Sequence, residues 1–245
     1  MNVRTVVRYG ITSVGSWAVW ASALAVASCA SVPRATGPLY SIDHVILGAS
    51  DLDAGMAQFA ARTGIMPAVG GVHPGVGTRN ALVSFGERHY LEILAPDPAQ
   101  GRTPANAGLG LYTSLTPEGW AIRTSDIDAT AATLRAAGFA VEGPIDGARV
   151  RPDGVRLAWR RLNVVAPAGD LLPFFIEWRT MEAHPSLSAP DGCTLASVAA
   201  REPHDDVLRK LVRTVGVSVA VSHDSLPALR FTLACGARGV VIFGR

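Results

Sequence analysis

The chain has 245 residues, 49% hydrophobic and 17% charged, so it can bury one large or two small cores and is not a disordered protein. Its formal net charge is +2, and Arg4 and Arg8 are the only charged residues among the first 28. Without these two, the 22 basic residues become 20, against 20 acidic ones. A balanced chain carries no electrostatic footprint for nucleic acid, so a nucleic-acid partner is not expected.

The N-terminal residues 1–28 are typical of a signal peptide, because two arginines precede an uncharged, mostly apolar run. The sequence Val26-Ala27-Ser28-Cys29 resembles the lipobox of bacterial lipoproteins. It predicts cleavage before Cys29, lipid on that thiol, and an exported protein anchored to a membrane and facing the periplasm or the cell exterior. An ordinary secretory signal and an uncleaved anchor helix are the alternatives. Residues 29–39 have the composition of a linker.

Residues 40–96 form the first predicted module. The run 42–47 is rich in branched residues and favours a strand. Asp51 or Asp53 can cap a helix that Gly64 ends. Further strands are expected at 67–69, 80–86 and 88–95.

A second module, residues 118–179, repeats the first. Ser50-Asp51-Leu52-Asp53-Ala54 recurs 75 residues later as Ser125-Asp126-Ile127-Asp128-Ala129. The pattern predicts a strand at 120–124, a helix at 127–137, and strands at 139–142, 157–165 and 172–178. Residues 143–154 contain two Pro and three Gly and are expected to form a long loop.

A third, partial unit at residues 193–244 is predicted to extend or cover the paired modules. Its pattern indicates strands at 194–201, 217–222, 229–233 and 239–243, with a helix at 204–214. Cys193 and Cys235 could form a disulfide in an exported protein or remain two buried thiols. No C-x-x-C spacing occurs, which argues against a cysteine zinc site.

Three motifs carry a family resemblance. Ile42-Asp43-His44-Val45, the helix lead at Asp51 and Tyr90-Leu91-Glu92-Ile93 resemble the vicinal oxygen chelate superfamily, and residues 70–81 look like its glyoxalase-like branch. The resemblance implies an α+β fold in which paired βαβββ modules enclose a cup, with a third partial βαβ-type unit at the C-terminus. In this superfamily, residues on the first and last strands of each module hold a divalent metal.

The resemblance places His44, Glu92 and Glu177 at three of the four metal-ligand positions, for an ion such as Zn, Mn, Ni or Fe. The repeat assigns the remaining position to Gly119, which has no side chain to coordinate a metal. Metal binding therefore stays open. Glu92, Glu177 or His73 is the candidate for moving a proton.

Other residues are candidates for substrate binding. His73 and Asn80 bracket a Gly-rich segment, residues 74–77, that could be a lid or a plain hairpin connection. Tyr90, Trp120 and Phe175 could line the cup with aromatic surface, although aromatic residues at strand spacing more often belong to the core.

Two functions remain open at this stage. The first is metal-assisted lyase, isomerase or dioxygenase chemistry on a small organic molecule. The second is a binding protein that sequesters such a molecule without metal and without turnover, and Gly119 favours it. Modules of this kind can pair within a chain or between two chains, so a homodimer is also open.

Overall fold

The computed structural model describes residues 40–165 and 171–245. The predicted signal peptide, Cys29 and the linker fall within residues 1–39, outside the described residues. Pro38–Arg245 is a compact unit. Within the described ranges, no helix is long and apolar enough to cross a membrane.

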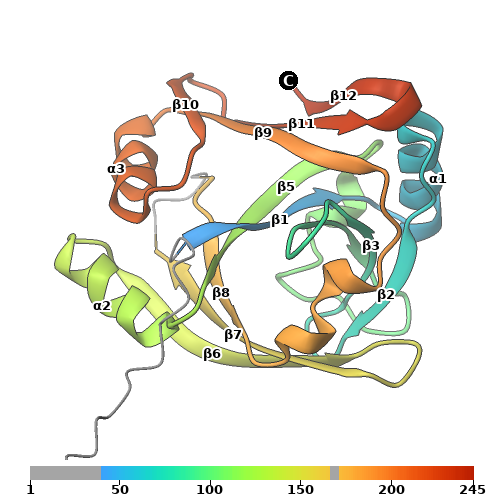
Figure 1. Cartoon of the computed structure of the whole chain (residues 1–245), viewed down its shortest axis with the longest axis horizontal. Helices are drawn as coiled ribbons and strands as arrows, with labels where there is room; N and C mark the ends of the chain where they lie inside the picture. Colours follow the sequence, from blue (N-terminus) through green and yellow to red (C-terminus); the bar gives the residue numbers. More distant parts are fainter. Residues whose placement is uncertain (1–39, 166–170) are drawn as a thin grey trace, which may run out of the picture. The chain divides into compact units, whose positions relative to one another are not determined.

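The two predicted modules build an eight-stranded mixed sheet in the order β2-β3-β4-β1-β5-β8-β7-β6 (Figure 1). The first module consists of β1 (Tyr40–Gly48), α1 (Leu52–Thr63), β2 (Ala68–His73), β3 (Thr78–Ser84) and β4 (Tyr90–Pro96). The second consists of β5 (Thr116–Thr124), α2 (Ile127–Ala136), β6 (Val141–Val150), β7 (Arg156–Val164) and β8 (Phe174–Trp178). Short 3-10 turns lie at Leu109–Leu111, Met181–Ala183, Pro185–Leu187 and Gly236–Arg238.

Strand pairing gives the two modules equivalent positions. β1 and β5 pair antiparallel at the centre, while β1 pairs parallel with β4 and β5 parallel with β8. At the other end of each module, the edge strands β2 and β6 approach one another, and Arg149 donates a hydrogen bond to the Gly70 carbonyl across this gap. The sheet therefore curls until its two edges meet.

Both module helices begin at the aspartates that the sequence repeats. Asp51 and Asp126 each accept a hydrogen bond, 2.9 Å long, from the backbone N–H three residues later. This is the N-cap geometry that satisfies a free N–H of the first helical turn. Gly64 ends α1 with φ 80, a left-handed conformation that glycine adopts without steric cost.

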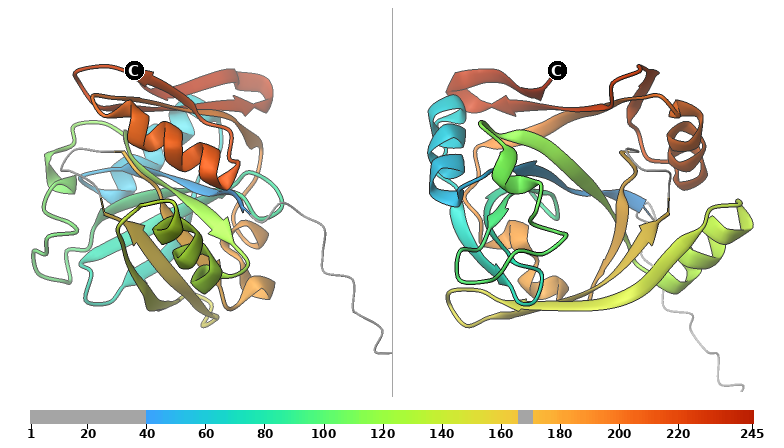
Figure 2. Two further views of the ribbon diagram at one scale, coloured as in Figure 1. Left: turned by 90° about the vertical axis from the view of Figure 1, so that its left-hand side faces the viewer. Right: turned by 180° about the vertical axis from the view of Figure 1, so that it is seen from behind.

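The third unit forms a separate four-stranded sheet, in the order β10-β9-β11-β12, on one side of the eight-stranded sheet (Figure 2). It contains β9 (Cys193–Glu202), α3 (Asp205–Val215), β10 (Ala220–His223), β11 (Ala228–Cys235) and β12 (Gly239–Gly244). Phe231 and Phe243 share a hydrophobic core with Trp120 and Phe175 of the second module, and Phe243 stacks on Phe59 of α1 at 5.5 Å. The small sheet therefore covers the outer face of the curled large sheet, the face that carries Trp120 and Phe175.

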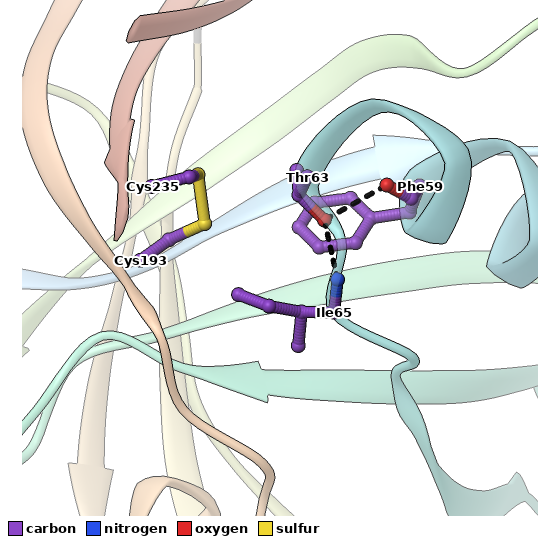
Figure 3. Close-up of a disulfide and its surroundings, with 5 residues drawn as sticks. All are labelled: Phe59, Thr63, Ile65, Cys193 and Cys235. Carbon is purple, nitrogen blue, oxygen red and sulfur yellow. Dashed lines mark hydrogen bonds between the residues drawn. A yellow bond between two sulfur atoms is a disulfide. The ribbon is translucent and has the colours of Figure 1, made fainter. Parts of the chain in front are cut away.

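Cys193 and Cys235 form a disulfide, which resolves the two readings that the sequence left open (Figure 3). The two cysteines are register partners on β9 and β11. Next to them, Thr63 at the end of α1 donates its hydroxyl proton to the Phe59 carbonyl and accepts from the Ile65 N–H. The disulfide thus ties the two strands at the end of the small sheet that lies beside α1.

The fold class predicted from the sequence is confirmed, including the short strand near residues 67–69, which is β2. The expected loop at 143–154 is wrong over most of its length, because β6 extends to Val150 and only the hairpin before β7 is irregular. Pro144 is compatible with a strand here because β6 lies at the edge of the sheet order. The glycines and prolines had concealed this strand.

Candidate functional site

The curled sheet encloses a cavity of about 610 Å³ whose two walls differ in chemistry. The wall from the first module carries polar groups, and the wall from the second is mainly aromatic and apolar, with two arginines. The polar wall contains His44, His73, Thr78, Asn80, Tyr90 and Glu92. The other contains Arg149, Trp159, Arg161, Phe174, Ile176 and Trp178.

An irregularity in β1 lets the side chains of His44 and its neighbour Asp43 form a hydrogen bond. Regular strand alternation would put these two side chains on opposite faces. The register against β5 shifts between Ile42 and His44, and His44 Nδ1 lies 2.7 Å from Asp43 Oδ1. Since an ionised carboxylate can only accept, the Nδ1 proton is donated to Asp43. In the neutral ring, Nε2 then carries the free lone pair.

Asp43 is 0% exposed and is held ionised by several donors. Trp178 Nε1 lies 3.2 Å and His184 Nε2 3.2 Å from Asp43 Oδ2, and Arg123 lies 3.7 Å from the same oxygen. Burial by itself raises the pKa of this carboxyl, but the hydrogen bonds from His184 and His44 outweigh it and lower the pKa far below its usual range. Asp43 therefore carries a negative charge next to His44 Nδ1 at neutral pH.

Glu92 lies between two imidazoles and is 7% exposed. Its Oε2 is 3.8 Å from His44 Nε2, and its Oε1 is 3.9 Å from His73 Nε2 and accepts from Asn80 Nδ2 at 2.7 Å. Burial raises the pKa of Glu92, but the surrounding histidines, Asn80 and Arg149 lower it below the ordinary value. Glu92 is therefore a carboxylate at neutral pH.

His73 completes the polar wall as a neutral ring. Burial lowers its pKa, the charge of Glu92 opposes this effect, and the Arg149 cation adds to it. Its Nδ1 lies 2.8 Å from Thr78 Oγ1, and Asn80 Nδ2 approaches its Nε2 at 3.4 Å. Since Asn80 can only donate through that nitrogen, His73 Nε2 is an acceptor and its proton sits on Nδ1.

The pairing of β1 with β5 identifies the counterpart of His44 in the second module. His44 pairs with Ala121, and Ile46 pairs with Gly119. Exchanging the two strands therefore places Gly119 where His44 stands, as the 75-residue repeat predicts. Gly119 borders the cavity.

The counterpart of Glu92 is Phe174 rather than Glu177. Ile46 on β1 pairs with Glu92, and Ala121, the counterpart of Ile46, pairs with Phe174. Glu177 is three residues further along β8, and it is not among the residues that line the cavity. The structure therefore does not bring Glu177 to His44 and Glu92, and its assignment as a shared ligand or cavity base is corrected.

Glu177 instead lies among arginines. Its Oε2 is 3.7 Å from Arg160 and 3.5 Å from Arg179, and Arg160 also donates to Asp128 of α2. These contacts belong to the face of the sheet that α2 covers.

The residues present do not fit the four-ligand metal centre that the fold family implies. His44 and Glu92 occupy two of its positions, but Gly119 and Phe174 occupy the other two and cannot coordinate an ion. Over residues 40–165 and 171–245, no group of three or more His, Cys, Asp or Glu side chains is arranged to hold a metal.

Some of the predicted substrate-binding residues line the cavity, and others belong to the hydrophobic core. His73, Asn80 and Tyr90 line the cavity, and Tyr90 stacks on His44 at 4.5 Å. Trp120 borders the cavity, but its side chain is part of the main core and its Nε1 donates to the Leu171 carbonyl. Phe175 is fully buried in that core, away from the cavity, and its neighbour Phe174 takes the place expected for it. Residues 74–77 are the β2–β3 hairpin connection.

Sequence reasoning missed Asp43, Arg149 and His184. In the sequence, Asp43 stands out only as a member of the motif around His44, and its position next to a candidate histidine is the signal that could identify it. Arg149 lies in the segment expected to be a loop, and no repeat or motif marks His184.

Comparison with known proteins places this geometry in context. A family model described as "Glyoxalase-like domain" matches residues 42–216, from β1 to the end of α3. No curated protein matches the chain. A hypothetical protein from Staphylococcus aureus has a similar structure, with a TM-score of 0.61 and 15% identity over 84% of this chain and 98% of that chain.

Two structures of methylmalonyl-CoA epimerase give lower TM-scores. The epimerase from Mycobacterium tuberculosis gives a TM-score of 0.41 and 23% identity over 58% of this chain and 90% of that one. An epimerase in complex with methylmalonyl-CoA and NH4+ gives 0.43 and 22% over 58% and 97%.

Proposed function

The chain belongs to the glyoxalase-like domain family of the vicinal oxygen chelate superfamily, and on this premise we propose that it binds a small organic molecule between its two modules. We propose that a side chain of the cavity then removes a proton from the bound molecule. One observation carries the proposal. His44, which donates to the buried Asp43, and the carboxylate of Glu92 lie together on one wall of a cavity of about 610 Å³ whose other wall is mainly aromatic.

His44 is the proposed base. Asp43 holds the proton on Nδ1, so the Nε2 lone pair can accept a proton from a substrate carbon next to a carbonyl. The electron pair left behind moves to the carbonyl oxygen and gives an enolate. The imidazolium formed would lie 3.8 Å from the Glu92 carboxylate and 2.7 Å from Asp43, and both charges would stabilise it.

The fate of the enolate decides the reaction class. Return of the proton to the other face of the carbon, or to a neighbouring atom, isomerises the substrate. Loss of a leaving group from the next carbon makes the reaction a lyase reaction. Asp43 has no direct access to the cavity and acts as a positioning residue for His44.

Sequestration without turnover is the second candidate. It is favoured by the second module, which contributes Gly119 and Phe174 where the first contributes His44 and Glu92. A cavity with an aromatic wall binds an apolar body whether or not a proton moves.

Proton exchange separates the two candidates. Purified protein, treated with EDTA, is incubated in D2O with pyruvate, phenylpyruvate or mandelate. The NMR signal of the hydrogen on the carbon next to the carbonyl group is followed, because exchange with deuterium removes this signal, and a protein-free sample is the blank. We expect exchange above the blank, lost in His44→Gln and retained in Glu177→Gln, which removes a carboxylate outside the cavity. Binding of these acids without exchange would reject proton transfer in favour of sequestration, and neither binding nor exchange would reject both.

We also propose that the protein is exported and anchored by lipid at Cys29. The apolar segment before the lipobox-like sequence supports this, and so does the Cys193–Cys235 disulfide, since disulfides persist mainly in oxidising compartments outside the cytosol.

A further inference from the structure

We infer that the molecule bound in this cavity is a small carboxylic acid with a flat apolar body, whose carboxylate pairs with Arg149 and whose body lies against Trp159. The inference rests on the proposed function, because it names the ligand class of the same cavity. It follows from the surroundings of Arg149, from the order of side chains on β6 and β7, and from the partners of the carboxylates that border the cavity.

Arg149 is a buried cation whose charge is felt by Glu92 on the polar wall. It is 4% exposed and borders the cavity, and its partner is the Gly70 carbonyl. It forms no ion pair with a carboxylate in the part of the chain that the structure describes. Arginine is almost never fully buried without a charged partner, because removing a guanidinium from water is costly. Burial accordingly lowers the pKa of Arg149, although the group stays charged at neutral pH.

The neighbours of Arg149 place it beside the proposed base. Its charge acts on Glu92, His73 and Tyr90, all of which line the polar wall. A carboxylate paired with Arg149 would therefore hold the adjacent carbon near His44 and Glu92. That is the carbon whose proton the proposed reaction moves.

Side chains from β6 and β7 form the surface next to Arg149. Arg149 pairs with Leu157, Gly147 with Trp159, and Ile145 with Arg161, so Trp159 lies between the two arginines along the strands. A Cβ added at Gly147 would lie 2.5 Å from the Trp159 ring, so only glycine leaves room for the indole here. The result is a flat aromatic surface next to a guanidinium, which suits an apolar body attached to a carboxylate.

The carboxylates that border the cavity have other partners. Glu92 lies between His44 and His73 and accepts from Asn80. Glu118 accepts from the Tyr112 hydroxyl, and Asp146 is exposed and lies 4.0 Å from Arg160. The other arginine of the cavity, Arg161, is exposed, lies over the Phe174 ring at 4.1 Å and donates to Asn163. Arg149 is therefore the buried arginine of this cavity to which a bound anion can be paired.

A matched pair of probes tests the inference. Phenylacetate and phenylacetamide have nearly the same shape and differ in charge, and their binding is measured by titration calorimetry at low salt. We expect wild-type protein to bind the acid about tenfold more tightly than the amide or better, since hydrogen bonds to charged groups are the stronger ones. The preference should shrink as salt is raised.

Arginine variants locate the anion. Arg149→Gln should lose about tenfold or more in affinity for phenylacetate and leave phenylacetamide unchanged. Arg160→Gln, on the other face of β7, and Arg151→Gln, just beyond β6, are the matched controls and should bind as wild type. Thermal unfolding of each variant checks its fold. If Arg149→Gln does not fold, Arg149→Lys, which keeps the charge but not the planar fork, replaces it and should weaken the acid selectively.

Three outcomes overturn the inference. Equal affinity for acid and amide, or an unchanged affinity for the acid in the Arg149 variants, rejects an anionic ligand at Arg149 and leaves the proposed function standing. Binding of neither probe also rejects the ligand class, and the exchange assay with other acids then decides the proposed function separately.

Discussion

Single residues determine how the duplicated cavity differs between its halves. The backbone of both modules offers equivalent positions on β1 and β5, and again on β4 and β8. His44 and Glu92 fill the first pair with titratable groups, whereas Gly119 and Phe174 fill the second with none. The fold therefore offers four equivalent positions, but only the two from the first module carry titratable side chains, so the cavity has one polar wall.

Restoring one ligand tests this reading of Gly119. A Cβ at this position would contact Ile46 Cδ1 at 3.8 Å, an ordinary van der Waals distance, so a larger side chain has room at its base. We expect Gly119→His to tighten Zn2+ binding by about tenfold or more, which is about 1.4 kcal/mol per factor of ten. Gly119→Ala, which adds the Cβ but no ligand, is the control. Equal zinc affinities of the two variants in calorimetry would show that position 119 does not serve the shared cavity.

Asp43 controls both His44 and the response of stability to acid. Its pKa is lowered in the folded protein, so its stabilising contribution is complete above the unfolded-state value near 3.8 and is lost as the pH falls below about 4. Asp43→Asn leaves several buried donors without their charged partner, and we expect a loss of about 1–3 kcal/mol at pH 7. Because the charge is gone, the variant should lose less stability on acidification than wild type.

Thermal unfolding between pH 7 and pH 3 measures this difference. Asp146→Asn, which changes an exposed carboxylate at the cavity border, should follow wild type. A parallel decline of Asp43→Asn and wild type in acid would contradict the role assigned to the buried charge.

The sequence predicts part of this site because strand periodicity is regular. His44, Glu92 and Tyr90 follow from alternation along two strands, and the structure brings them together. The same reasoning places Glu177 and Phe175 wrongly. The residue of β8 that corresponds to Glu92 is Phe174, 82 residues later, whereas Glu177 lies 85 residues after Glu92. An odd error in register turns every side chain to the opposite face of the sheet.

At the level of elements, helices and central strands were predictable and the edge strand was not. The repeated aspartates that cap α1 and α2 are local signals with a fixed geometry. β6 contains Gly143, Pro144 and Gly147, each of which lowers strand propensity, and it forms because β7 offers a partner along its length. Pairing partners of this kind are tertiary information that a single segment does not carry.

The disulfide between β9 and β11 stabilises the small sheet without touching the cavity. It closes a loop with a sequence separation of 42. We expect the double change Cys193→Ser and Cys235→Ser to lower the free energy of unfolding by about 2–4 kcal/mol. Ligand binding at temperatures below the transition should be unchanged, because neither cysteine lines the cavity.

Urea unfolding of the wild type with and without reductant provides the control. Reductant should reproduce the loss in wild type and have no effect on the double variant. Equal stability of wild type and double variant would contradict a structural role for the bond.

For the whole molecule, the proposed binding cavity and the predicted anchor lie in different stretches of the sequence. The described unit starts at β1, directly after the residues 29–39 that have linker composition. The cavity is built from β1 to β8, and the third unit packs on the opposite face of the large sheet. The proposed binding and the proposed anchoring therefore use separate parts of the chain, so each can be removed without the other.

Replacing Cys29 tests the anchor by itself. If lipid is attached to this thiol, wild-type protein should sediment with membranes and be released by detergent but not by high salt, because buried acyl chains hold it rather than charge. Cys29→Ser removes the attachment atom, and we expect the variant in the soluble fraction with the thermal stability and phenylacetate affinity of the wild type, since the residues that line the cavity run from His44 to Trp178. A membrane fraction unchanged by the substitution would assign the anchoring to the apolar segment before Cys29 instead of to lipid.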